Sequence, residues 1–183
     1  MRIISGKLGR RRIRVPGSVA RPSTDRLREA LFSILSQRIE GAKVLDLYAG
    51  SGALGLESLS RGAESCVFVD ESREAQQVIK KNLSELDLEG GRIVSGDAIR
   101  MLKADRGKYD LIFADPPYFK SSADSDHVHR LLSSKALPSL LAKDGLLVVE
   151  DPPVNKRENY DAWFLLDKRQ YGSCGILFYQ SSE

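Results

Sequence analysis

Strand-like and helix-like segments alternate along this chain from residue 43 onward, and this alternation limits the possible folds more than any other feature. Apolar, β-type runs occur at residues 44–47, 66–70, 92–95, 111–114 and 146–149. Helical patterns lie between them, among others at residues 73–86, 98–103 and 127–141. A strand that follows a crossover helix lies parallel to the strand before it, so the pattern predicts an α/β fold with helices on both faces of one sheet.

The pattern changes after residue 149. Residues 163–171 and 176–179 are two strand-like runs with Gly172 and Ser173 between them and no helix. So short a connection predicts an antiparallel pair at the end of the sheet.

The N-terminal residues are expected to form a unit of their own. Residues 2–6 and 12–15 are strand-like, and the glycines between them mark a turn, which predicts a short β-hairpin. Residues 21–25 then favour the start of a helix, because Ser23 or Thr24 can cap it and Asp25 complements its dipole. We therefore divide the chain into a hairpin extension, residues 1–22, and a main domain, residues 23–183.

Positive charge is concentrated at the N-terminal end of the chain. Residues 1–40 hold ten Lys/Arg and three Asp/Glu, a net charge of +7, whereas the remaining 143 residues have a net charge of −4. The cations that we assign to nucleic-acid contact are Lys7, Arg10, Arg11, Arg12 and Arg14. A solvated basic surface without a polyanionic partner is the alternative.

Composition excludes other classes of protein. Two cysteines are too few for a disulfide scaffold, and no apolar run approaches the roughly 18 residues of a membrane span. We expect a cytoplasmic protein with no membrane partner. The two histidines have no nearby cysteine, so no metal site is expected.

Ligands of open α/β sheets bind beyond the carboxyl ends of the strands, so the residues that follow each strand form the candidate site. Gly50, Gly52 and Gly55 follow the first strand with the spacing G-x-G-x-x-G and open a helix. Asp70 ends the second strand, where its carboxylate can accept two hydrogen bonds from a ribose diol. This arrangement fits a nucleoside cofactor, either NAD or S-adenosylmethionine.

Two carboxylates favour S-adenosylmethionine. Asp46 ends the first strand among apolar residues, where it needs a partner; the methionine ammonium group fits, and the NAD pyrophosphate would be repelled. Asp97 follows the third strand and can accept from the adenine amine, while the N–H of Ala98 can reach a ring nitrogen. Asp70 and Asp97 could instead cap the helices that follow them, and this alternative stays open.

The fourth strand ends in Asp115-Pro116-Pro117-Tyr118. The two prolines remove two N–H donors, so the Asp115 carboxylate and the Pro116 carbonyl remain as acceptors beside the flat ring of Tyr118. Two acceptors and a ring suit a planar base with an exocyclic amine, held so that its nitrogen faces an electrophilic methyl group. We assign these four residues to catalysis.

These motifs resemble those of the bacterial 16S rRNA guanine-N2 methyltransferases, which act on the small ribosomal subunit. The resemblance rests on Asp46-Leu47-Tyr48-Ala49-Gly50-Ser51-Gly52-Ala53-Leu54-Gly55-Leu56-Glu57, Ser60-Arg61-Gly62-Ala63 and Asp115-Pro116-Pro117-Tyr118. It extends upstream to residues 2–7 and 21–29, and so covers nearly the whole chain. It implies a class I methyltransferase (Rossmann-like) fold with seven strands and an antiparallel last strand, and S-adenosylmethionine as the donor.

The same resemblance implies the roles of the site residues. The residues that it assigns to the cofactor are Asp46, Gly50, Gly52, Asp70 and Asp97, with Thr24 near the methionine end, and we add Ala49 and Ala98 to the predicted cofactor residues. Residues 115–118 would hold the guanine. The expected partner is 16S rRNA, within an assembled or assembling small subunit, and the expected state is a monomer.

Two alternatives remain open. A DNA adenine-N6 methyltransferase shares the Asp-Pro-Pro-Tyr motif, although 183 residues leave little room for a target-recognition domain. A non-catalytic RNA-binding or ribosome assembly factor could keep the same fold, although the intact residues 115–118 argue against it.

Overall fold

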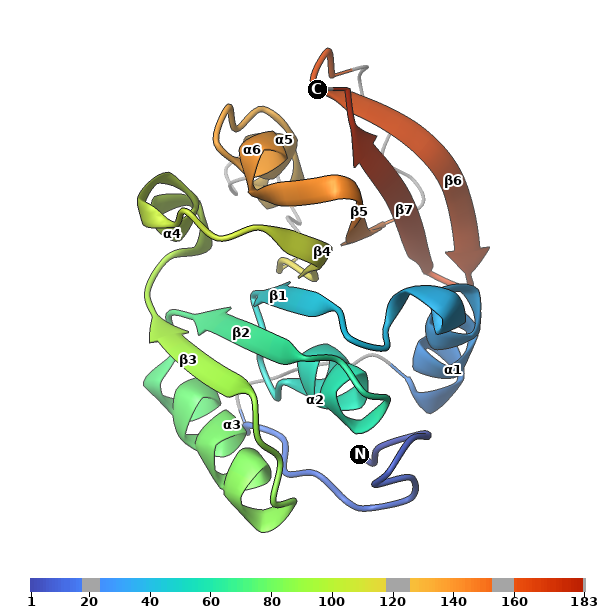
Figure 1. The fold of residues 1–183 in the computed structure, drawn as a ribbon, viewed down its shortest axis with the longest axis vertical. Helices are drawn as coiled ribbons and strands as arrows, with labels where there is room; N and C mark the ends of the chain where they lie inside the picture. The colour runs from blue at the N-terminus through green and yellow to red at the C-terminus, as the bar shows by residue number, and fades with distance from the viewer. Residues whose placement is uncertain (18–23, 118–125, 153–159, 183) are drawn as a thin grey trace.

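The computed structural model describes residues 1–17, 24–117, 126–152 and 160–182, and its centre is a seven-stranded sheet (Figure 1). The strands are β1 (Lys43–Leu47), β2 (Ser65–Asp70), β3 (Gly91–Ser95), β4 (Tyr109–Ala114), β5 (Leu141–Asp151), β6 (Trp163–Tyr171) and β7 (Cys174–Ser181). Their order is β3-β2-β1-β4-β5-β7-β6. All pairings up to β5 are parallel, and β7 is antiparallel to both of its neighbours. The predicted α/β sheet and its antiparallel end pair are confirmed.

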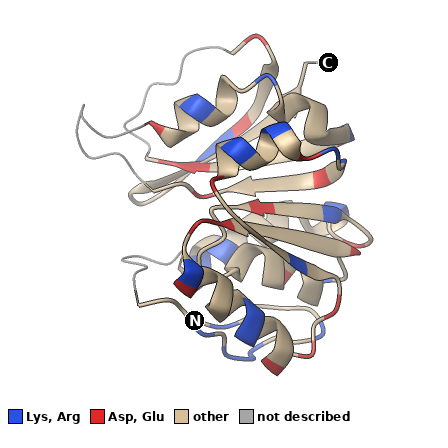
Figure 2. Ribbon diagram, turned by 90° about the vertical axis from the view of Figure 1, so that its left-hand side faces the viewer, with Lys and Arg blue, Asp and Glu red and all other residues tan. Residues whose placement is uncertain are grey.

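Helices cover both faces of this sheet (Figures 1 and 2). They are α1 (Asp25–Ile34), the 3₁₀ turn η1 (Ser36–Arg38), α2 (Ala53–Ser60), α3 (Arg73–Glu85), α4 (Ala98–Ala104), α5 (His127–Leu132) and α6 (Leu137–Leu140). One core joins one face of the sheet to α1, α2 and α3, and a second joins the other face to α4, α5 and α6. Successive residues of the central strands alternate between the two cores, as the two-residue period of a strand requires.

The helix predicted over residues 127–141 is interrupted. α5 ends at Leu132, a second short helix spans Leu137–Leu140, and Leu141 already belongs to β5. Pro138 explains the break, because proline fits the first turn of a helix but cannot continue one from the residues before it.

The N-terminal segment, residues 1–17, forms less sheet than the sequence predicts. Its two expected strands are reduced to one antiparallel bridge between Arg2 and Arg12. Gly6 and Arg10 both have a positive φ, so the backbone departs from extended geometry on both sides of the turn. Ile3 and Ile13 are nevertheless buried, and they belong to the same core as α1 and α2.

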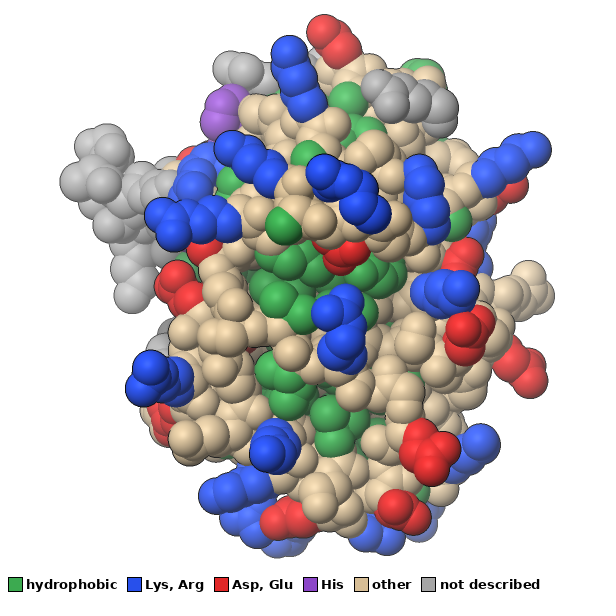
Figure 3. All heavy atoms as spheres, turned by 60° about the vertical axis from the view of Figure 1, so that its left-hand side comes forward, with side chains coloured by type: hydrophobic (Ala, Val, Ile, Leu, Met, Phe, Trp, Pro, Cys, Tyr) green, Lys and Arg blue, Asp and Glu red, His purple; other side chains and the backbone are tan. Residues whose placement is uncertain are grey.

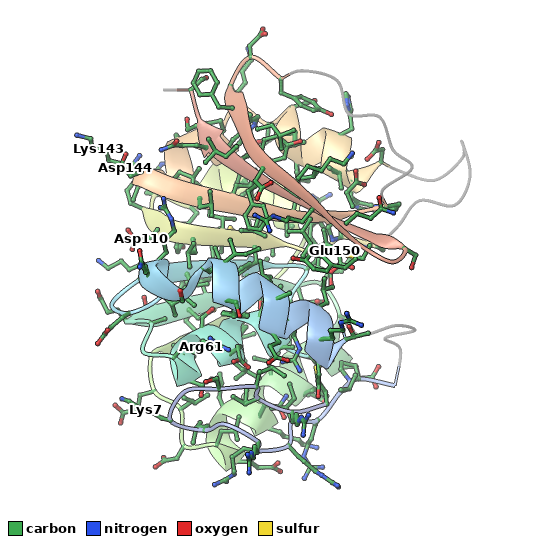
Figure 4. The ribbon with its side chains drawn as sticks, turned by 90° about the vertical axis from the view of Figure 1, so that its right-hand side faces the viewer. Lys7, Arg61, Asp110, Lys143, Asp144 and Glu150 are labelled. Atoms are coloured by element: carbon green, nitrogen blue, oxygen red, sulfur yellow. The ribbon has the colours of Figure 1, made fainter. Side chains whose placement is uncertain are left out.

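A buried carboxylate ties this segment to the main core. Glu57 on α2 is fully buried and accepts hydrogen bonds from the amides of Ile4 at 2.6 Å and Ser5 at 3.0 Å. It also pairs with the Arg61 guanidinium at 2.7 Å, and Arg28 of α1 lies 3.8 Å away. Arg61 lies between α1 and the N-terminal segment (Figure 4). A buried charge is tolerated because it is paired in this way.

Within the described ranges, no helix is both long and apolar enough to cross a membrane.

Candidate active site

The carboxyl ends of the central strands surround a cavity of about 520 Å³. The residues that the sequence assigned to the site and that line this cavity are Asp46, Ala49, Gly50, Asp70, Asp97, Ala98, Asp115 and Pro117. They lie at or just after the carboxyl ends of four strands, β1, β2, β3 and β4, and the parallel arrangement brings them to one edge. In Figure 2, acidic residues lie at this end of several strands.

Asp46 is the most deeply placed of the cavity carboxylates. Its side chain is buried at the end of β1, and Oδ2 accepts a hydrogen bond from the N–H of Gly55 at 3.0 Å. Burial raises the pKa of Asp46 to about 8; the Gly55 hydrogen bond opposes this shift, and the charges of Asp115 and Asp70 add to it. A cationic group in the cavity would favour the ionised carboxylate.

Asp70 supports the Gly-rich turn from inside. Its Oδ2 accepts from the N–H of Gly50 at 2.8 Å, and its Oδ1 accepts from the N–H of Ser72 at 2.8 Å. Ser72, not Asp70, caps α3, with its hydroxyl accepting from Ala75. Each carboxylate oxygen has a further lone pair, so Asp70 can still accept from a ligand hydroxyl in the cavity.

Asp97 does cap a helix. It is the N-cap of α4, and its Oδ1 accepts from the N–H of Arg100 at 2.9 Å. Asp97 also lines the cavity together with Ala98, the first residue of α4. Capping and a ligand contact are therefore compatible, because Oδ2 has no part in this bond.

The glycines of the turn divide between the cavity and the core. Gly50 lines the cavity with φ +54°, whereas Gly52 does not line it and has φ +76° as the N-cap of α2. A Cβ on Gly52 would lie 3.1 Å from Cγ1 of Ile79 and 3.2 Å from Cε1 of Phe68. Gly52 thus shapes the turn against the core, and its contact with the cofactor stays a prediction.

Two other predicted site residues also lie outside the cavity lining as described. Thr24 is exposed and caps α1, where its Oγ1 accepts from the N–H of Leu27 at 3.2 Å. Pro116 is buried between Asp115 and Pro117, which both reach the cavity. Tyr118 lies outside the described residues, so its expected role stays a prediction.

The cavity contains an aromatic pair that the sequence did not reveal. Tyr48 and His127 both line it, their rings meet edge to face at 5.6 Å, and the tyrosine Oη lies 3.5 Å from Nδ1 of His127. Tyr48 has a φ of +58°, which is uncommon for a bulky residue and is typical of strained functional turns. Burial raises its pKa to about 12, so the hydroxyl stays neutral. The positive φ of Tyr48 sets this residue apart in the structure. No sequence pattern indicates a positive φ at a tyrosine, so the sequence could not single it out.

The five cations assigned to nucleic acid are all exposed, but they differ in their partners. Arg14 forms an ion pair with Glu85 on α3 at 2.6 Å, and the Arg11 guanidinium donates to the Glu85 carbonyl at 3.2 Å. No described residue forms an ion pair with Arg10 or Arg12. The Lys7 amide donates to Ser60 at the far end of α2 from the cavity, and its side chain points outward (Figure 4).

The described residues contain no cluster of three or more His, Cys, Asp or Glu that could hold a metal ion.

The doubly wound sheet with its antiparallel β7, together with a carboxylate-lined cavity at the strand ends, defines the class of protein: a class I methyltransferase that uses S-adenosylmethionine. The chain belongs to the family described as Conserved hypothetical protein 95, whose model matches residues 1–180.

Relatives and solved structures agree with this family over the whole chain. The ribosomal RNA small subunit methyltransferase D of Escherichia coli (strain K12) is 35% identical over 98% of this chain and 89% of its own length. The protein of the same name from Haemophilus influenzae is 31% identical over 99% and 94%. The structure of yhhF from Escherichia coli has a TM-score of 0.82 at 34% identity, covering 99% of this chain and 97% of its own.

Proposed function

We propose that this protein transfers a methyl group from S-adenosylmethionine to the exocyclic N2 amine of a guanine in 16S rRNA of the small ribosomal subunit. Relatives named ribosomal RNA small subunit methyltransferase D support an rRNA substrate. The observation that carries the proposal is the position of Asp115: it directly follows β4 and lines the same cavity as Asp46 and Asp70.

The cavity offers suitable groups for the cofactor. Asp46 would face the methionine ammonium group, Asp70 the ribose diol, and Asp97 with Ala98 the adenine, while Ala49 and Gly50 would lie against it from the turn. When bound, S-adenosylmethionine supplies an electrophilic methyl group on a sulfonium.

Residues 115–117 offer acceptors to the target base. Pro116 and Pro117 have no backbone N–H, so the strand end presents the Asp115 carboxylate and the Pro116 carbonyl without competing donors. Two acceptors can hold both hydrogens of an exocyclic amine, which leaves the nitrogen lone pair free to point at the methyl group. The guanine would have to leave its stack to reach this cavity, and Tyr118 would stack on it.

The decisive substrate experiment uses small ribosomal subunits from a strain that lacks this protein. Incubation with the protein and S-adenosylmethionine, followed by mass spectrometry of the rRNA nucleosides, should show N2-methylguanosine. Duplex and single-stranded DNA are assayed in parallel. Methylation of adenine in DNA with none in the subunits would replace this proposal with the DNA enzyme.

The role of Asp115 is tested by Asp115→Ala. We expect turnover to fall by at least about 10²-fold with cofactor affinity largely kept, because the acceptor that orients the amine is lost. The matched control is Asp151→Ala, since Asp151 starts a second Asp-Pro-Pro sequence at the end of β5 but does not line the cavity. Equal rates for Asp115→Ala and wild type would refute the mechanism, and a rate lost equally in both variants would point to damaged folding instead.

A further inference from the structure

A second basic surface lies on the face of the sheet opposite the N-terminal segment. It consists of exposed Arg92 on β3, Arg100 and Lys103 on α4, and Arg106 and Lys108 in the connection to β4. We name it the α4 surface. We propose that the α4 surface binds the phosphate backbone of the substrate RNA beside the flipped base; this inference rests on the proposed function.

The positive charge of this surface is only partly cancelled by its own acidic residues. Residues 92–108 contain five Lys/Arg and two Asp/Glu, a net charge of +3 within a body whose net charge is −4. Both acidic residues are engaged by their own chain segment: Asp97 caps α4, and Asp105 accepts from the Tyr109 hydroxyl at 2.6 Å and from the Gly107 amide at 2.7 Å. Burial opposes the ionisation of Asp105, but its hydrogen bonds and the charge of nearby Arg92 lower its pKa, so this carboxylate is charged at neutral pH and offsets part of the charge of Arg92.

The charge of Arg92 acts on nearby Asp105, but among the described residues the five cations form no close ion pair. Arg106 donates to the carbonyls of Lys103 and Asp105, and Lys108 donates to the carbonyl of Ser139. These bonds to neutral carbonyls hold the two side chains in place and leave their charge available to a phosphate.

The position of α4 connects this surface to the cavity. Asp97 and Ala98 line the cavity, Arg100 follows within the first turn, and Lys103 lies one turn further on the same side of the helix. The seven residues of α4 extend about 10 Å away from the cavity edge. Figure 3 views this side of the molecule, where Lys and Arg side chains form a band across the upper half. RNA that places a base in the cavity can therefore run along α4.

The N-terminal segment packs in the core on the opposite face of the sheet, with α1, α2 and α3. The two basic surfaces are thus separate, and they can be tested independently. RNA that contacts both basic surfaces would pass around the edge of the sheet at β3, because β3 is the outermost strand on this side.

The test is the double variant Arg100→Gln/Lys103→Gln, because Gln keeps helix propensity and both side chains lack any described hydrogen bond. Its matched control is Lys143→Gln/Lys168→Gln, two exposed lysines on β5 and on β6, the strand at the other edge of the sheet. Binding of a 16S rRNA fragment is measured between about 50 and 200 mM salt, together with S-adenosylmethionine affinity and methylation of small subunits.

We expect the α4 double variant to bind RNA roughly tenfold more weakly, with a salt slope smaller by between about one and two, because two phosphate contacts are lost. S-adenosylmethionine affinity should not change. An RNA affinity and salt slope equal to those of the control, in an enzyme that methylates subunits, would overturn the α4 surface alone. Absence of methylation by the wild-type protein would instead refute the proposed function.

Discussion

Asp46 shows how a site residue can work against the stability of its own fold. Its carboxyl is buried at the end of β1 with one hydrogen bond, from the Gly55 amide. The folded pKa of about 8 lies above the ordinary value of 3.8, so the folded state binds this proton more tightly than the unfolded chain. Stability therefore falls as pH rises from about 4 to about 8, and this penalty is fully present above the folded pKa.

We expect Asp46→Asn to raise the free energy of unfolding, by an amount that grows between pH 4 and pH 8. Asn has the shape of the protonated acid and can still accept from Gly55, but it has no charge to desolvate. Urea unfolding at pH 5, 7 and 8.5 measures the difference in free energy of unfolding from the wild type. Asp161→Asn, at an exposed position, is the control, and its difference should not change with pH. A difference independent of pH would contradict the buried-charge explanation. The same variant should bind S-adenosylmethionine more weakly, because a cation loses its counter-charge.

The sequence placed the cavity carboxylates at the strand ends, where the structure has them lining one cavity, but it could not show their other hydrogen bonds. Asp70 holds Gly50 and Ser72 by their amides, and Asp97 caps α4. Strand-end position is readable from periodicity, whereas a hydrogen bond to a particular amide depends on the exact path of the following turn. For the same reason Tyr48 and His127 were missed, since their meeting requires β1 and α5 to be placed in space.

At the scale of elements, α2 packs so closely on β2 that the third glycine of the G-x-G-x-x-G sequence is a packing residue. A Cβ on Gly55 would lie 2.3 Å from Cε1 of Phe68 and 2.5 Å from Sγ of Cys66. Both neighbours belong to the central sheet and are fully buried. The helix would have to move away from the strand to admit even a methyl group.

We predict that Gly55→Ala destabilises the protein by about 2–3 kcal/mol, because an overpacked core must shift its side chains or its backbone. Urea denaturation gives the value. Gly9→Ala is the control, since a Cβ there meets nothing closer than 3.4 Å and φ lies outside the left-handed region. Equal stability of the two variants would mean that α2 can retreat from β2 without cost.

The strand and helix pattern predicted most elements because their apolar periods are regular. Two departures have local causes that a period cannot show. Pro138 splits the segment predicted as one helix, and the positive φ values of Gly6 and Arg10 prevent a regular hairpin ladder. The amides of Ile4 and Ser5 are satisfied by Glu57, a residue more than 50 positions away, which no local pattern could indicate.

At the scale of the whole molecule, charge is distributed more finely than net values suggest. The division into a +7 segment and a −4 remainder pointed to the N-terminal arginines and concealed the α4 surface within the acidic part. The structure also separates the N-terminal cations: Arg14 is neutralised by Glu85, and Arg10 and Arg12 have no described ion pair.

If the N-terminal segment contacts RNA, Arg10→Gln/Arg12→Gln should reduce the magnitude of the salt slope by between about one and two, as fewer counterions are released. Arg14→Gln should change it less, because Glu85 already neutralises that guanidinium. Titration of an rRNA fragment at several salt concentrations measures both. A larger change of the salt slope in Arg14→Gln than in the Arg10/Arg12 double variant would contradict the greater role expected for Arg10 and Arg12.

The buried Glu57 carboxylate also binds the backbone close to the start of the chain. Amides near a chain end usually exchange their hydrogens quickly, because the ends open without disturbing the rest. Here, releasing Ile4 and Ser5 would take two donors from a carboxylate with no access to water. We therefore expect both amides to exchange with deuterium only on global unfolding, at rates like those of β1. In Glu57→Gln the exchange of these two amides should accelerate before that of β1 does, as followed residue by residue by NMR.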